Sequence, residues 1–146
     1  CTLIGGAYAL RVGGGVVTAK NVYCGNTTTE DFYRAAGTLN KTNCASEDSS
    51  ATDTSGSDET ATNCAATGAY TTSTFTNVTA GSQNYHLVTG SSLIGAGVDT
   101  TGDSAPLNFT TDIDGVTRDA TWDIGADAWY VAASAMANDI CIIFEC

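Results

Sequence analysis

Basic residues are scarce in this chain of 146 residues. Five Lys and Arg stand against 16 Asp and Glu, and the formal net charge at pH 7 is −11. Nucleic acids and anionic membranes are bound through Lys and Arg side chains that neutralise their charge. The composition therefore argues against both as partners and leaves cations, neutral glycans and other proteins.

The chain also has little Pro and no long apolar run. It contains 1 Pro and 16 Gly, and 42% of its residues are hydrophobic. No apolar stretch reaches the roughly 18 residues of a membrane-spanning helix. Abundant Thr, Ser and Gly are typical of short strands joined by tight turns. We expect one all-β domain over residues 1–146, without a transmembrane segment.

Six cysteines and the lack of a C-x-x-C pair indicate disulfides rather than a metal cluster. No charged or apolar leader precedes the first residue, so we expect a mature extracellular or cell-surface form. The disulfide candidates are Cys1, Cys24, Cys44, Cys64, Cys141 and Cys146. Four sequons give glycosylation candidates at Asn26, Asn40, Asn77 and Asn108. Thr-rich sequences also form such triplets by chance.

Three segments align without gaps at a constant spacing: "GVVTAKNVYC" ends at Cys24, "AAGTLNKTNC" at Cys44 and "GSDETATNC" at Cys64. A period of about 20 residues predicts a solenoid whose coils stack on one another. Cysteines in neighbouring coils would lie within disulfide reach. The preferred pairing is Cys1 with Cys24 and Cys44 with Cys64, and free thiols buried in a column remain the alternative. Residues 46–60, "SEDSSATDTSGSDET", predict a solvated loop.

A different pattern begins at Tyr85. It comprises "YHL" at 85–87, "SSLIGAG" at 91–97, "DIDG" at 112–115 followed by Arg118, and "DIGA" at 123–126 followed by Tyr130. Order and spacing resemble the C-terminal closing segment of right-handed parallel β-helix proteins, the pectate-lyase-like solenoids of secreted and surface proteins. Ser92, Gly95 and residues 127–130 depart from that pattern. The resemblance implies a short right-handed parallel β-helix closed by a C-terminal cap over residues 85–130.

The local chemistry gives this segment a structural role. "DIDG" predicts Asp112 and Asp114 on one strand face, with Ile113 inward and Gly115 turning. "WDIG" repeats the device with Ile124 inward, and we expect Arg118 to pin the loop through a carboxylate. The alternative is a Ca²⁺ site formed by Asp99, Asp103, Asp112, Asp114 and Asp123.

The sequence gives little support for a catalytic function. The basic residues are too scattered for a lyase that stabilises a carbanion, and a pair of carboxylates for a glycosidase is too easily found among 16 acids to discriminate. We expect His86 to be a packed structural residue. Trp122 and Trp129 are expected to cap the last coil, with glycan stacking as the alternative.

Both ends of the chain are apolar and β-prone. The candidate assembly residues are Leu3, Ile4, Ile140, Ile142, Ile143 and Phe144, the last four in a terminal strand over residues 131–146. Uncapped coils invite head-to-tail stacking, and contacts that do not close give filaments. We expect a non-catalytic extracellular subunit that polymerises with copies of itself. The alternative is a glycan-binding or glycan-cleaving module of an adhesin or tail spike.

Overall fold

The computed structural model describes residues 1–65 and 68–129. Over these residues the protein is all-β, as predicted, with a single turn of 3-10 helix. The elements are β1 (Thr2–Ile4), β2 (Tyr8–Lys20), β3 (Tyr23–Gly25), β4 (Glu30–Thr42), β5 (Ala45–Ser46), η1 (Ser50–Thr52), β6 (Glu59–Thr62), β7 (Phe75–Asn77) and β8 (Asn84–Leu87). No helix within the described ranges is long and apolar enough to cross a membrane.

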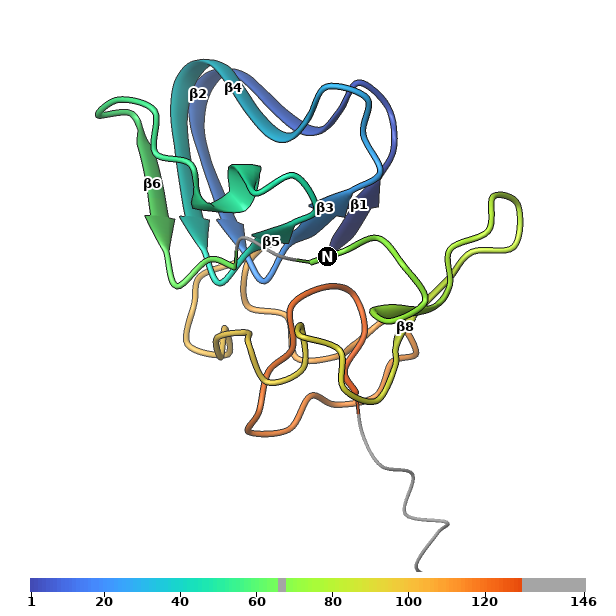
Figure 1. The fold of residues 1–146 in the computed structure, drawn as a ribbon. Coiled ribbons are helices and arrows are strands. Elements are labelled where there is room, and N and C mark those ends of the chain that lie inside the picture. The colour runs from blue at the N-terminus through green and yellow to red at the C-terminus, as the bar shows by residue number, and fades with distance from the viewer. Residues whose placement is uncertain (66–67, 130–146) are drawn as a thin grey trace, which may run out of the picture.

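The first six strands alternate between two parallel sheets. One sheet has the order β1-β3-β5 and the other the order β2-β4-β6, and Figure 1 shows them at an angle to each other with η1 between them. Each strand pairs with the strand two places earlier in the chain, always in parallel. The chain therefore makes successive turns that lie side by side.

Strand side chains alternate between the core and solvent, which is the period-two pattern of a sheet buried on one face. In β4, Leu39 and Lys41 are fully buried while Asn40 and Thr42 are half-buried. Leu39 lies opposite Val17 of β2 on one side and Glu59 of β6 on the other. The turns thus stack equivalent side chains above one another.

The spacing between paired residues is not constant. Lys20 pairs with Thr42, and Thr42 in turn pairs with Thr62, so the first turn is longer than the second by two positions. At this irregularity β2 and β4 approach each other closely. A Cβ at Gly37 would lie 2.3 Å from the carbonyl oxygen of Gly15, and the φ of Gly37 is +80°. Only Gly meets both conditions there.

The buried side chains form two clusters. The first lies between the two parallel sheets and includes Val12, Phe32 and Leu39. The second joins Tyr23 to the later part of the chain, including Phe75 and Ile124. The Tyr23 hydroxyl donates to the carbonyl oxygen of Gly68 at 2.6 Å, which satisfies the polar end of this buried ring.

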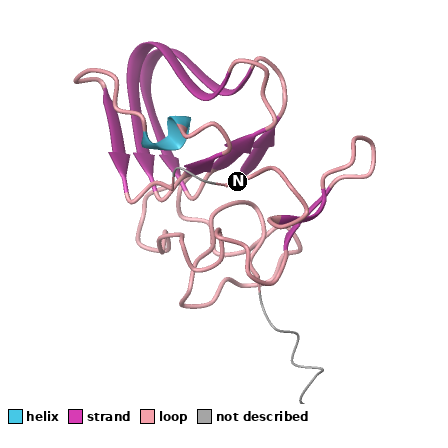
Figure 2. Ribbon diagram, in the orientation of Figure 1, coloured by secondary structure: helices cyan, strands magenta, loops and turns pink. Residues whose placement is uncertain are grey.

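The closing segment, residues 85–129, is mostly loop and lies on one side of the two parallel sheets (Figures 1 and 2). It docks on the corners between sheets, where Asn21 and Asn43 adopt positive φ values of 53° and 49°. The Asn43 amide donates to the carbonyl oxygen of Ala96, and the backbone N–H of Gly125 donates to the carbonyl oxygen of Asn21. The segment therefore contacts the first two turns from the side.

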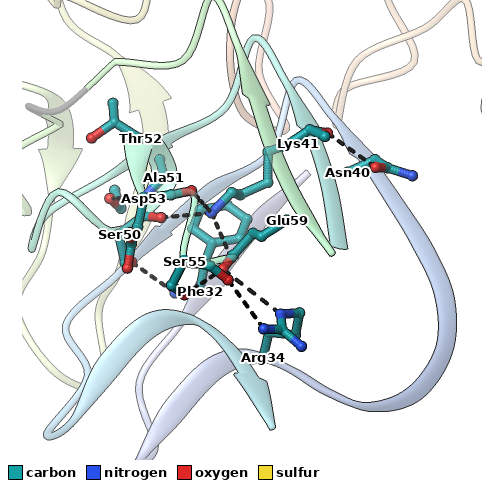
Figure 3. Close-up of polar contacts among 12 residues, drawn as sticks. Phe32, Arg34, Asn40, Lys41, Ser50, Ala51, Thr52, Asp53, Ser55 and Glu59 are labelled. Atoms are coloured by element: carbon teal, nitrogen blue, oxygen red, sulfur yellow. Dashed lines mark hydrogen bonds and ion pairs between the residues drawn. The ribbon is translucent and has the colours of Figure 1, made fainter. Parts of the chain in front are cut away.

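Most of the polar segment 46–60 is exposed, in line with its composition, but a few of its residues are buried. Ser50 and Ala51 of η1 are buried, as is Glu59 at the start of β6. Figure 3 shows the cause: Lys41 Nζ, fully buried, lies 2.8 Å from Glu59 Oε1 and donates to the carbonyl oxygens of Ser50 and Asp53. A buried ammonium needs such partners, and this segment supplies them.

Candidate functional site

The β2-β4-β6 sheet has two outer strands, β2 and β6, whereas β5 of the other sheet is bridged by Ala65 through Ala45. β1 and β2 lie at one end of the stacked turns, and β5 and β6 lie at the other. From Val12 to Ala19 the long strand β2 carries no charge, and Val16 is 72% exposed. The one acid of β6, Glu59, is buried. Proteins usually protect sheet edges with charged residues or Pro. In β2 the charged residues Arg11 and Lys20 stand outside this neutral stretch, so the stretch from Val12 to Ala19 lacks that protection.

The first hydrophobic cluster is incompletely covered at the same two ends. Its partly buried members are Leu3, Ala9, Leu10, Val17 and Cys64. Leu3 belongs to β1, the next three belong to β2, and Cys64 follows β6. The core is therefore closed in the middle of the stack and open at its ends. Ile4, also predicted for assembly, packs half-buried against the second cluster.

The cysteines do not follow the gapless alignment. Because the first turn is the longer one, Cys24 lies opposite Ser46 and not Cys44. Cys44 and Cys64 do share a column, since the residues that follow them, Ala45 and Ala65, form a parallel bridge. All four described cysteines, Cys1 included, are free in this structure.

The Cys44 and Cys64 thiols interact through a hydrogen bond and differ in acidity. The hydrogen bond from Cys44 lowers the pKa of Cys64, and the same bond together with burial raises the pKa of Cys44. Burial raises the pKa of Cys24. Cys64 is therefore the reactive thiol of this set, because the thiolate is the nucleophilic form.

The five aspartates of the predicted Ca²⁺ site have separate partners. Asp103 pairs with Lys20 at 2.7 Å. Asp99 and Asp112 accept hydrogen bonds from nearby backbone N–H groups. Asp123 is buried and accepts from the N–H groups of Gly95 and Trp129. Asp114 alone belongs to a group of three ligating side chains, together with His86 and Asp127.

Two details of the closing segment differ from the expectation. Ile113 is 56% exposed because "DIDG" forms a turn, in which Asp112 Oδ1 accepts from the N–H groups of Asp114 and Val116. Arg118 pins the loop through backbone carbonyls, at 3.1 Å from Gly125 and 2.9 Å from Ala126, and forms no ion pair among the described residues. Ile124 and Gly115 behave as predicted, the first fully buried and the second with φ +77°.

The aromatic residues of the segment serve packing. Trp122 is 4% exposed. The Arg118 guanidinium lies over the Trp122 ring, 5.5 Å from its centroid, and the same ring packs against Phe109. His86 is not packed: its side chain is 42% exposed, and the hydrogen bond with Asp114 raises its pKa. Sequence reasoning missed this contact because the two residues lie 28 positions apart.

An acidic pocket of about 350 Å³ lies beside η1, lined by Glu30, Asp48, Ser49, Ser50 and Asp53. Burial and the nearby Asp48 raise the pKa of Glu30. For Asp48 burial acts in the same direction, but hydrogen bonds from Ser50 outweigh it and leave the pKa lowered. Two carboxyls with opposite shifts are one arrangement that supports acid–base chemistry.

The four glycosylation candidates differ in their exposure. Asn26 and Asn108 are exposed, whereas Asn40 and Asn77 are half-buried. Asn40 Oδ1 accepts from the Thr60 hydroxyl, and Asn77 Oδ1 from the N–H of Thr79. The rest of the predicted set lies outside the described residues: Tyr130, Ile140, Cys141, Ile142, Ile143, Phe144 and Cys146.

Comparison of the chain with protein-family models, with curated proteins and with solved structures found no match in any of the three.

Proposed function

We propose that this chain is a structural, non-catalytic subunit of an extracellular or cell-surface assembly, built as a short parallel β-helix that stacks head to tail. The observation that carries the proposal is the position of the incompletely covered core. Leu3, Leu10 and Val17 at one end and Cys64 at the other are the apolar side chains that the stack leaves partly exposed. A second copy laid on β1 and β2 would cover the first three side chains, and a copy laid on β6 would cover Cys64.

The backbone supports the same contact. Edge strands present unpaired N–H and C=O groups that another chain can pair with. Because β2 and β6 are edges of the same parallel sheet, a parallel contact between β6 of one copy and β2 of the next continues the sheet order. This contact is heterologous and repeats without closing, which gives a filament. Within the described residues, no strand of the closing segment pairs with β2 or β6.

The test is electron microscopy and sedimentation velocity of the full chain over a range of concentrations. We expect filaments, and we expect Val16→Lys to abolish them, because a charge in the neutral stretch of β2 opposes strand addition. Ile113→Lys is the matched control, since it adds the same charge to an exposed apolar residue of the closing segment. A wild-type chain that stays monomeric at high concentration, or filaments that survive Val16→Lys, contradicts the proposal.

The acidic pocket beside η1 favours a second function, cleavage of neutral glycans. Glu30, whose pKa is raised, would serve as general acid, and Asp48, whose pKa is lowered, as its ionised partner. Against this role, both oxygens of Asp48 already accept hydrogen bonds, from Asp31 and Ser50. Those bonds also give Asp48 a structural function.

Reducing-sugar release from a panel of neutral polysaccharides separates the two functions. Activity that Glu30→Gln removes and Asp58→Asn retains would establish the glycosidase, because Asp58 is an exposed acid outside the pocket. Lack of release by the wild-type chain, or equal activity in both variants, leaves the assembly function alone.

A further inference from the structure

Three potential metal ligands from distant parts of the chain meet beside β8. The ligating atoms of His86, Asp114 and Asp127 all lie within 4.8 Å of one another. They line a pocket of about 260 Å³ together with Leu87, Ala128 and Trp129. His86 belongs to β8, and the two aspartates belong to separate turns of the closing segment.

The imidazole ring is oriented by a neighbouring amide. Asn84 Oδ1 accepts the backbone N–H of His86 at 3.1 Å and also contacts ring Nδ1. Because an amide oxygen only accepts, Nδ1 carries the hydrogen. The second ring nitrogen, Nε2, lies 2.8 Å from Asp114 Oδ2, a hydrogen bond in which Nε2–H donates to the carboxylate. A metal ion at this place would replace the Nε2 hydrogen. Histidines that bind metals commonly donate their other ring N–H to an oxygen in this way.

The Asp127 carboxylate is buried without an ion pair among the described residues. The residue is 4% exposed, and Oδ2 accepts the backbone N–H of Leu87 at 2.7 Å. The field of Arg118 reaches Asp127, but its guanidinium donates to the carbonyls of Gly125 and Ala126. Buried carboxylates are normally paired or bound to a metal, and Asp127 forms no ion pair within the described part of the chain.

The other bases of the sequence are engaged elsewhere. Lys20 pairs with Asp103, Arg34 and Lys41 pair with Glu59, and Arg11 lies over the ring of Tyr33. The second carboxylate of the group, Asp114, therefore has the His86 ring as its one cationic partner among the described residues. One imidazole faces two carboxylates, which leaves an excess of negative charge in the pocket.

We propose that His86, Asp114 and Asp127 form a binding site for a divalent ion of the Zn²⁺ type. One imidazole nitrogen and two carboxylate oxygens suit Zn²⁺, whereas Ca²⁺ takes six to eight oxygens. Ligands about 2.0 Å from a tetrahedral ion lie roughly 3 Å from one another, a spacing that small side-chain movements reach from the observed cluster. Water completes the coordination, and the ion joins β8 to the two later turns that carry Asp114 and Asp127.

His86 is the one histidine of the whole sequence, so its ring can be followed by ¹⁵N NMR without ambiguity. The experiment titrates the reduced full chain with ZnCl₂. We expect one equivalent to shift the Nε2 resonance while Nδ1 keeps its hydrogen, and CaCl₂ to leave both unchanged. Zinc bound by the cysteines instead would leave the His86 nitrogen resonances unchanged. An unchanged Nε2 resonance in tenfold excess of ZnCl₂ would overturn the proposal.

Variants test the carboxylates. Asp114→Asn and Asp127→Asn should each weaken zinc binding at least about tenfold, measured by the same resonance. Asp119→Asn is the control, because Asp119 is an exposed acid of the same segment whose carboxylate accepts from the N–H of Thr121. If Asp127→Asn fails to fold, Asp114→Asn decides, since the Asp114 side chain is 44% exposed. Wild-type affinity in Asp114→Asn means an adventitious histidine contact and refutes the site.

Discussion

The side-chain amide of Asn21 and the backbone of Val98 exchange two hydrogen bonds. Asn21 Nδ2 donates to the carbonyl oxygen of Val98 at 2.7 Å, and the N–H of Val98 donates to Asn21 Oδ1 at 2.8 Å. Asn21 is fully buried. Its amide thus imitates a neighbouring strand and fastens the closing segment to the corner of the first turn.

Replacing Asn21 by Ala should destabilise the protein by about 3 kcal/mol in urea denaturation, because the change leaves two backbone groups of Val98 without partners, each costing roughly 1–3 kcal/mol if buried. It also places Ala at positive φ. Asn26→Ala is the control, because Asn26 has a similar φ of 55° but is exposed. The Asn26→Ala variant should lose only the energy of placing Ala instead of Asn at positive φ, roughly 1–2 kcal/mol. Equal losses in the two variants would contradict the role given to the amide.

Lys41→Met should lower the free energy of unfolding by about 3–5 kcal/mol, because it leaves the Glu59 carboxylate buried without its closest cation. A double variant that also carries Glu59→Met should recover most of the loss, since two apolar side chains of similar volume need no partner. Lys20→Met is the comparison. Its pair with Asp103 is partly exposed, at 23% and 25%, and should contribute at most about 1 kcal/mol. A larger loss for Lys20→Met would reverse this ranking.

Gly37→Ala should destabilise more than Gly81→Ala. Both glycines have positive φ, +80° and +83°, so both substitutions carry the same backbone penalty of roughly 1–2 kcal/mol. A Cβ at Gly37 would also meet the backbone of Gly14 and Gly15, at 2.6 and 2.3 Å, whereas nothing lies within 4 Å of one at Gly81. Overpacking adds about 1–3 kcal/mol, which thermal or urea unfolding resolves. Indistinguishable variants would mean that the Gly14–Gly15 backbone gives way freely.

A mild oxidant should join Cys44 to Cys64 and not Cys1 to Cys24. The first pair shares a column, because Ala45 and Ala65 form a parallel bridge, whereas Cys24 lies opposite Ser46. Peptide mapping after oxidation of the folded chain identifies the product. A peptide containing Cys1 bonded to Cys24 would show that the register of the first turn is different.

Alkylation of the reduced chain gives a pH-dependent readout of the same pair. Because the pKa of Cys64 is lowered and those of Cys24 and Cys44 are raised, Cys64 should react first. Its rate should level off below the ordinary thiol pKa of about 8.5. Mass spectrometry at a series of pH values measures each site. Faster modification of Cys44 than of Cys64 would reverse the assignment of the thiolate.

The sequence carries much of the information on stacking and little on the contacts between distant segments. The constant cysteine spacing finds the column of Cys44 and Cys64 because the turn between them has the length of that spacing. It misplaces Cys24 because the preceding turn is longer, and a gapless alignment cannot register the two additional positions. Alternation of apolar residues marks strands well, but it does not report the length of the corners between them.

Within the closing segment two similar motifs have different outcomes. Ile124 is buried and Ile113 is 56% exposed, although both stand between an Asp and a later Gly. The first packs with Phe75 and Leu93 in the second cluster, and the second lies in a turn closed by Asp112. The proposed zinc site has no sequence signature either, because its three residues converge only after β8 and the two turns have docked. Tertiary packing decides both cases.

The corner asparagines join two successive turns to one loop. Asn21 binds Val98 and Asn43 binds Ala96, and these two partners stand only two positions apart in the closing segment. The loop therefore spans the boundary between the two turns. A displacement of one turn along the other would have to break one of these contacts, so the closing segment also holds the register of the strands it does not pair with.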